Sequence, residues 1–160
     1  MGMYCEVSVA ARGDVERLSA APTLLGGLVQ AGTATAQRIS LEKAWHGLHY
    51  LLTGEVWEGN GPLAFLLAGG ENVDDDEESG LRWFSPEEAV QIHRALSAVS
   101  DDKLWERFDA EQMEQLEVYP GIWDEDEQEL KQEYVMYFQQ LKDVVAAAVD
   151  SGQGLLVSIG

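Results

Sequence analysis

The chain is poor in basic residues and in cysteine, and it lacks a long apolar run. Its 160 residues include 10 Lys and Arg against 29 Asp and Glu, a formal net charge of −19. Phosphate backbones and anionic lipids are bound mainly through Lys and Arg, so this composition argues against a nucleic acid or membrane partner. The single cysteine, Cys5, excludes an intrachain disulfide and a cysteine-rich zinc site.

The N-terminal sequence MGMYCEVSV has no basic segment followed by a long apolar segment, so it does not resemble a secretory signal. No stretch approaches the roughly 20 apolar residues that a membrane-spanning helix needs. We therefore expect a cytoplasmic protein whose residues 1–160 form one domain.

The hydrophobic pattern predicts an α+β fold: a helix-rich single domain with a small mixed β-sheet that uses both chain ends. Strands are expected at 3–9, 81–84 and 154–159. Helices are expected after capping residues at 14, 40, 85, 100, 109 and 124–126. Residues 22–39 are ambiguous, because their glycines and threonines weaken a helical interpretation. The strongest local signal is Ser85-Pro86-Glu87-Glu88, which combines a capping box with proline at the first helical position.

The acidic segment 69–80 carries six Asp and Glu between Glu71 and Glu78. Calcium-binding EF-hand loops need oxygen ligands at alternating positions, a central glycine and a terminal glutamate, and this segment lacks that spacing. An exposed, mutually repelling loop is the better interpretation.

The chain contains no phosphate-binding glycine loop, no dinucleotide fingerprint, no nucleophile elbow and no H-E-x-x-H motif. Cys5 falls in a predicted strand with no neighbouring base and is expected to be a buried, inert thiol. His93 continues an apolar helical face and is expected to be structural.

The segment LEKAWHGLHYLLTG, 41–54, holds the remaining two histidines. Helical spacing places apolar residues on one face and a polar seam beside it, which consists of Glu42, His46, His49 and Thr53. Two histidines fall short of a zinc site, so no metal and no cofactor are assigned. His49, at the margin of the core face, could transfer protons; the alternative, which we favour, is a histidine that hydrogen bonds a backbone carbonyl or a tyrosine.

The motifs around Trp45, Leu48-His49, Leu52-Thr53-Gly54 and Tyr119-Pro120-Gly121-Ile122-Trp123 resemble those of the YfbM-like bacterial family, whose function is unknown. The resemblance extends over essentially the whole chain and includes the Gly69-Gly70 pair and the SPEE passage. It implies a compact domain of a cytoplasmic bacterial protein and no particular reaction. Its recurring residues fall on Trp45, His49, Thr53, Gly54, Tyr119, Pro120 and Trp123, whereas His46 matches less well.

Two functions follow as hypotheses. The first is a binding or interaction domain that engages a basic protein partner, as toxin-immunity proteins do by analogy, with the aromatic YPGIW turn as a recognition surface. The second is a small-molecule enzyme or ligand pocket. In it His49 is the acid/base, Glu42 or Thr53 orients the imidazole, and Trp45, Tyr119 and Trp123 form stacking walls. This second hypothesis requires that 41–54 and 119–123 meet in space.

Overall fold

A computed structural model describes residues 3–13, 38–73 and 81–160. Within these residues, five strands form one sheet in the order β2–β1–β5–β4–β3. The strands are β1 (Cys5–Ala10), β2 (Arg38–Glu42), β3 (Glu71–Asn72), β4 (Leu81–Phe84) and β5 (Gly154–Ile159). The helix predicted after residue 14 and most of the 22–39 segment lie outside the described residues.

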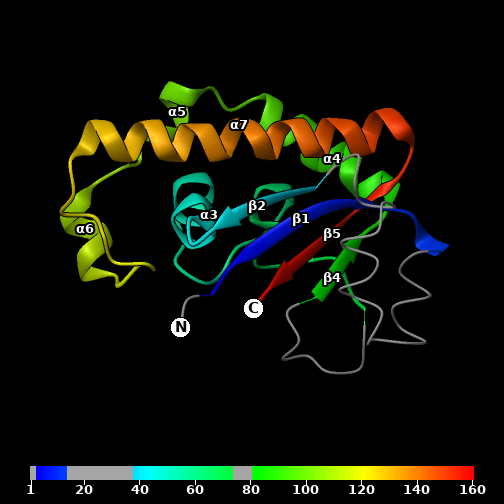
Figure 1. Ribbon diagram of the computed structural model, residues 1–160, viewed down its shortest axis with the longest axis horizontal. Coiled ribbons are helices and arrows are strands. Elements are labelled where there is room, and N and C mark those ends of the chain that lie inside the picture. The colour runs from blue at the N-terminus through cyan, green and yellow to red at the C-terminus, as the bar shows by residue number, and fades with distance from the viewer. Residues whose placement is uncertain (1–2, 14–37, 74–80) are drawn as a thin grey trace.

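The two chain ends lie side by side in the middle of this sheet (Figure 1). β1 and β5 pair along their whole length, from Cys5 opposite Ile159 to Ala10 opposite Gly154. Backbone hydrogen bonds in both directions between Tyr4 and Gly160, at 2.9 and 3.0 Å, extend the pairing beyond the strands. The predicted α+β class and the use of both chain ends are confirmed.

All four strand pairings in the described residues are antiparallel, so the prediction of a mixed sheet is wrong. α4 starts directly after β4, and the long helix α7 ends directly before β5. The helices between them therefore leave from and return to the same end of the sheet. That return makes β5 antiparallel to β4, whereas a parallel pair would need a crossover to the opposite end.

The described residues contain five α-helices and a short 3₁₀ helix, η2 (Pro62–Ala64). The α-helices are α3 (Trp45–Thr53), α4 (Pro86–Ser97), α5 (Asp101–Trp105), α6 (Ala110–Gln115) and α7 (Glu127–Ser151). The predicted capping box at Ser85 is confirmed: its Oγ accepts from the Glu88 N–H, and the Glu88 carboxylate accepts from the Ser85 N–H. Ser100, Asp109 and Asp126 also cap their helices as expected.

The helix at 41–54 starts later than predicted. Residues 38–42 form β2, the edge strand paired with β1, and α3 begins only at Trp45 with Ala44 as an N-cap without a side-chain bond. Ser40 therefore does not cap this helix, because strand pairing takes up the backbone there. Gly54 ends α3 as predicted, with a φ of +79° and its N–H donating to the Tyr50 carbonyl.

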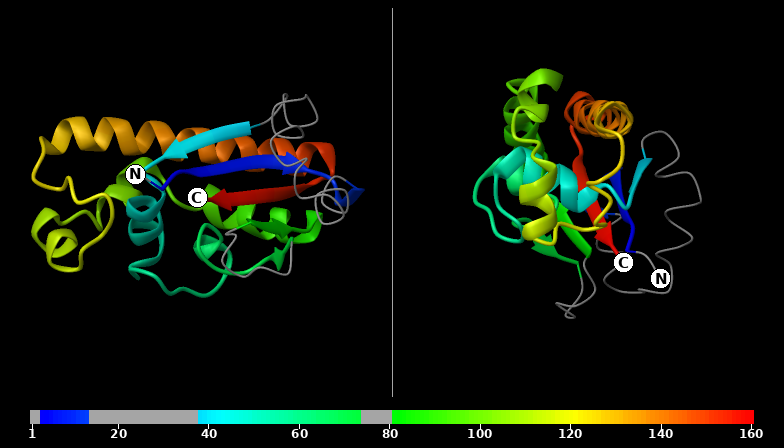
Figure 2. Two further views of the ribbon diagram at one scale, coloured as in Figure 1. Left: turned by 60° about the horizontal axis from the view of Figure 1, so that its bottom comes forward. Right: turned by 90° about the vertical axis from the view of Figure 1, so that its left-hand side faces the viewer.

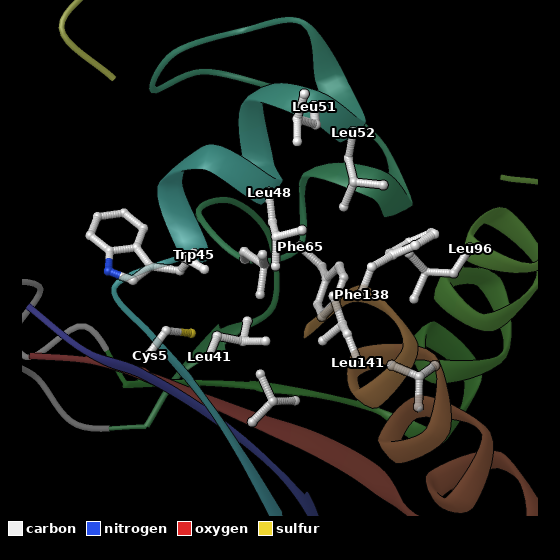
Figure 3. Packing of buried hydrophobic residues seen from close by; sticks show 14 of the residues in the cluster. Cys5, Leu41, Trp45, Leu48, Leu51, Leu52, Phe65, Leu96, Phe138 and Leu141 are labelled. Carbon is white, nitrogen blue, oxygen red and sulfur yellow. The ribbon is translucent and has the colours of Figure 1, made fainter. Parts of the chain in front are cut away.

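The helices lie on one side of the sheet, and α7 runs along the sheet, roughly in the direction of its strands (Figures 1 and 2). The predicted apolar stripe of α7 is buried, from Leu130 to Ala148. Side chains from the sheet, α3, α4 and α7 meet in the main core, where Cys5, Leu48, Phe65 and Phe138 point toward one another (Figure 3). Cys5 is buried as predicted, and burial raises the pKa of its thiol to about 12. No helix in the described ranges is long and apolar enough to cross a membrane.

Gly154, the first residue of β5, leaves no space for a side chain. A Cβ there would lie 2.1 Å from the Phe84 carbonyl oxygen, which belongs to the backbone of the paired strand β4. Gly154→Ala is expected to lower the free energy of unfolding by about 1–3 kcal/mol, because the strands must move apart.

Urea denaturation followed by circular dichroism measures this effect. Gly160→Ala is the matched control, since nothing lies within 4 Å of a Cβ at that position. Equal denaturation midpoints for the two variants would contradict the contact.

Candidate functional site

His46 joins three segments that are distant in the sequence. Its side chain is fully buried in α3. Nδ1 accepts the backbone N–H of Tyr119 at 2.9 Å, so Nε2 must carry the ring proton, which it donates to the Val56 carbonyl at 2.7 Å. Both ring nitrogens are thus committed, and the imidazole is held in one neutral tautomer.

An aromatic stack surrounds this histidine. Trp57 lies on the His46 ring with centroids 4.1 Å apart, and Trp45 stacks at 5.3 Å from His46 and at 5.6 Å from Tyr119. Met3 ties the N-terminal segment to the stack: its carbonyl accepts from Trp45 Nε1, and its N–H donates to the Tyr119 hydroxyl, both at 3.0 Å. We call Trp45, His46, Trp57 and Tyr119 the aromatic–histidine cluster.

His49 lies one turn further along α3 and is also fully buried. Its Nε2 donates to the Glu58 carbonyl at 2.7 Å, so in the neutral ring Nδ1 carries no proton. Within the described residues this Nδ1 has no hydrogen-bond partner. The chain at Gly59 closes over the ring, since a Cβ at Gly59 would lie 3.3 Å from His49 Cε1.

Burial lowers the pKa of both histidines, because removing the imidazolium from water is costly. The hydrogen bonds to the Val56 and Glu58 carbonyls act in the opposite direction but do not reverse the shift. Protonation of His46 would also turn Nδ1 into a donor that faces the Tyr119 N–H. Both rings are therefore neutral at pH 7.

The segments 41–54 and 119–123 do meet in space. Trp45 and Tyr119, two of the three expected stacking residues, lie against each other, but the histidine that bonds to this turn is His46 and not His49. His46, predicted to lie further from the core than His49, is equally buried, and it is His46 that bonds to Tyr119. Trp123 is also buried: its Nε1 donates to the Val118 carbonyl, and its ring packs against Tyr134 of α7. A Cβ at Gly47 would lie 2.6 Å from Trp123, so α3 and this indole are in close contact.

Glu42 is not on the helical seam, because it belongs to β2. It is exposed, its φ is +51°, and its N–H donates to the Ser40 hydroxyl. Together with burial and Glu133, Glu42 raises the pKa of Tyr137 on α7. Thr53 does sit on α3, where its hydroxyl donates to the His49 carbonyl rather than to the imidazole.

Two clefts lie beside the C-terminal half of α3. The smaller, about 340 Å³, is lined by Thr53 and by part of the connection that follows α3, including the acids Glu55 and Glu58. The larger, about 560 Å³, lies between α3, α4 and α5. Neither has His49, Trp45, Tyr119 or Trp123 among its lining residues. The catalytic and stacking roles proposed for these residues stay predictions, and His49 would need residues 58–59 to move before it could reach a substrate.

Trp57 is the feature that sequence analysis missed. Its side chain is 58% exposed although one ring face is stacked on His46. It stands between Glu55 and Glu58, and all three residues are exposed. The sequence EVWEGNGP indicates a connection but contains no periodicity that tells an exposed tryptophan from a buried one. The isolated aromatic between two acids was the only available signal.

The fold and the aromatic–histidine cluster together define the class of this protein. It is a helix-rich α+β domain in which the buried His46 supports a partly exposed aromatic stack. The chain belongs to the family described as a domain of unknown function, DUF1877, whose model matches residues 1–158. Together with the comparisons with individual proteins that follow, this match confirms the resemblance to the YfbM-like family.

Comparison with individual proteins gives the same relationship. The chain is 31% identical to the protein YfbM of Escherichia coli strain K12 over 91 residues, which are 54% of this chain and 53% of that protein. The match therefore spans about half of the relative's length. The crystal structure of YfbM from Escherichia coli, a protein of unknown function, superimposes with a TM-score of 0.75 at 18% identity, covering 98% of this chain and 99% of that one. This likeness establishes a shared fold.

The neutral state of the buried histidines makes stability depend on pH. A histidine in the unfolded chain has a pKa of about 6.5. Because the folded pKa of His46 is lower, the unfolded chain takes up the proton first as the pH falls. The free energy of unfolding is therefore expected to decrease below about pH 6.5, with a slope of at most about 1.4 kcal/mol per pH unit for each such histidine.

Urea titrations between neutral and mildly acidic pH test this expectation. His46→Asn should be less stable at neutral pH but should show a shallower dependence on pH, while the carboxylates contribute equally to both proteins. Parallel curves for the variant and the wild type would refute the assignment to His46.

Proposed function

We propose that this protein is a binding domain that engages a basic segment of a protein partner through a surface centred on Trp57. The Trp57 surface consists of Glu55, Trp57 and Glu58. The observation that carries the proposal is an exposed indole held in place by stacking on a buried, fully hydrogen-bonded histidine. A large aromatic group that is rigid before binding loses little conformational entropy on association, which is typical of binding hot spots.

The charge of this surface supports a cationic partner. Glu55 and Glu58 flank the indole, and the chain as a whole carries −19. Lys and Arg side chains bind the faces of aromatic rings, and nearby carboxylates add to that attraction. The chain contains such a contact close to the cluster, because the Lys43 ammonium lies 5.9 Å from the centre of the Tyr4 ring. A Lys or Arg of a partner fits the outer face of Trp57 in the same way.

The family is described as a domain of unknown function and the Escherichia coli protein YfbM as a protein of unknown function, so the support for this proposal comes from the Trp57 surface itself. Neutralisation of a basic partner, by analogy with immunity proteins, is the more specific form of the proposal. A cytoplasmic location belongs to the same proposal.

Trp57→Ala is expected to abolish retention of basic partners in a pull-down from the native host at low and moderate salt. The fold should survive, because more than half of the side chain is already in water. Met136→Ala on α7 is the matched control, since it removes another large apolar side chain that is 46% exposed.

The role of charge is tested separately with Glu55→Gln/Glu58→Gln. Glu133→Gln/Asp143→Asn removes the same net charge from exposed positions on α7 and should retain the partner. Retention that is equal in W57A and wild type, or equal loss in both charge pairs, would rule out a specific Trp57 surface.

A further inference from the structure

A second surface of this domain differs in chemistry from the Trp57 surface. The cleft of about 560 Å³ lies between the end of α3, the 3₁₀ helix η2, the end of α4, and α5. Leu52 of α3 and Leu96 of α4, both labelled in Figure 3, mark the two longer helices beside it. Its apolar walls are formed by Leu51, Leu52, Leu63, Ala95, Ala98 and Val99. Both its size and its apolar lining are within the range of small-molecule sites.

Charged groups line the α5 side of this cleft: Lys103, Glu106 and Arg107. Two cations against one acid give this cleft a local net charge of +1, in a chain that carries −19. Arg107 is anchored, because its Nη1 donates to the Leu51 carbonyl at 2.9 Å. Within the described residues, this is the hydrogen bond that its guanidinium makes, which leaves N–H groups that could bind an anion.

Among the described residues, no carboxylate pairs with either cation. In the described part of the chain, the recorded ion pair is the one between Lys131 and Asp102, and neither Lys103 nor Arg107 has a carboxylate partner. Acidic residues outnumber basic ones almost three to one, so a cleft with two cations and one acid among its lining residues differs in charge from the chain as a whole. The arrangement is complementary to a molecule with an apolar body and one negatively charged end.

The neighbouring cleft restricts how such a molecule would lie. The two clefts share Leu52 and Leu63 as walls, but the smaller one is bordered by Glu55 and Glu58. These carboxylates repel an anion, so the charged end is directed toward Lys103 and Arg107. The apolar body then covers Leu52, Leu63 and Ala95.

We propose that the α3–α4–α5 cleft binds a small amphipathic organic anion, with a carboxylate at Lys103 and Arg107 and an aliphatic body on the leucine and alanine walls. The occupant is a small molecule rather than a protein segment. This site is independent of the Trp57 surface, and either can fail without the other.

Octanoate is a suitable probe, since it combines a carboxylate with an aliphatic chain. Titration of the ¹⁵N-labelled full chain, followed by amide chemical shifts, is expected to move signals of residues 51–52, 63, 95–99 and 103–107 in a saturable manner. Octylammonium, which has the same chain and the opposite charge, should bind more weakly by about tenfold or more. Octanoate shifts that are absent from 95–107, or equal affinity for octylammonium, would overturn the proposal.

Separate variants test the cationic end of the cleft and its apolar walls. Lys103→Glu should weaken octanoate binding about fivefold or more, because it replaces attraction with repulsion at an exposed position that does not support the fold. Arg94→Gln is the control: it removes a cation from α4 at an exposed position outside the cleft and should bind octanoate like the wild type.

Ala95→Phe fills the cleft and should abolish octanoate binding while the remaining amide spectrum stays dispersed. Trp57→Ala should leave octanoate affinity unchanged. Undiminished binding by K103E or A95F would show that octanoate binds elsewhere and that the cleft is not the site.

Discussion

The hydrogen bonds of His46 hold together the three segments that form the aromatic–histidine cluster and carry the Trp57 surface. One ring nitrogen accepts the Tyr119 N–H and the other donates to the Val56 carbonyl, so α3, the connection after it and the turn before α7 are fixed to one imidazole. The ring must stay neutral to make both bonds, and burial favours that state. The same imidazole supports Trp57 from below, which allows an indole to stay exposed and yet rigid.

The sheet provides the frame for this arrangement. Pairing of β1 with β5 brings the chain ends together, and it places Met3 where it can bond to both Trp45 and Tyr119. α7 covers the sheet and, through Tyr134, packs against Trp123 behind α3. Hydrogen bonds and aromatic contacts thus join the N-terminal segment, α3 and the turn before α7. The two clefts lie at the other end of α3, beside its last residues. Opposite charges at these clefts, acidic beside Glu58 and basic beside Lys103, distinguish two binding chemistries on one small domain.

Local signals were sufficient for much of the fold. The capping box at Ser85, the caps of α5 to α7, the stripe of α7 and the strands at both chain ends depend on neighbouring residues, and they are found where the sequence places them. Residues 40–44 were assigned wrongly because β2 exists only through pairing with β1, a partner more than thirty residues away in the chain. The direction of the strands was missed for a similar reason, since it depends on where the helices return the chain.

The sequence by itself determined the family, the α+β class and the net negative charge, because motifs, periodicity and composition are properties of the chain. It also suggested a histidine bonded to a backbone carbonyl. Only the tertiary structure decided which histidine joins Tyr119, that His49 is sealed beneath Gly59, and that Trp57 faces solvent. The periodicity of one helix predicts which face of that helix a residue occupies, but not what that face contacts. Burial and hydrogen bonding are set by segments that come from elsewhere in the chain, and no local pattern encodes their position.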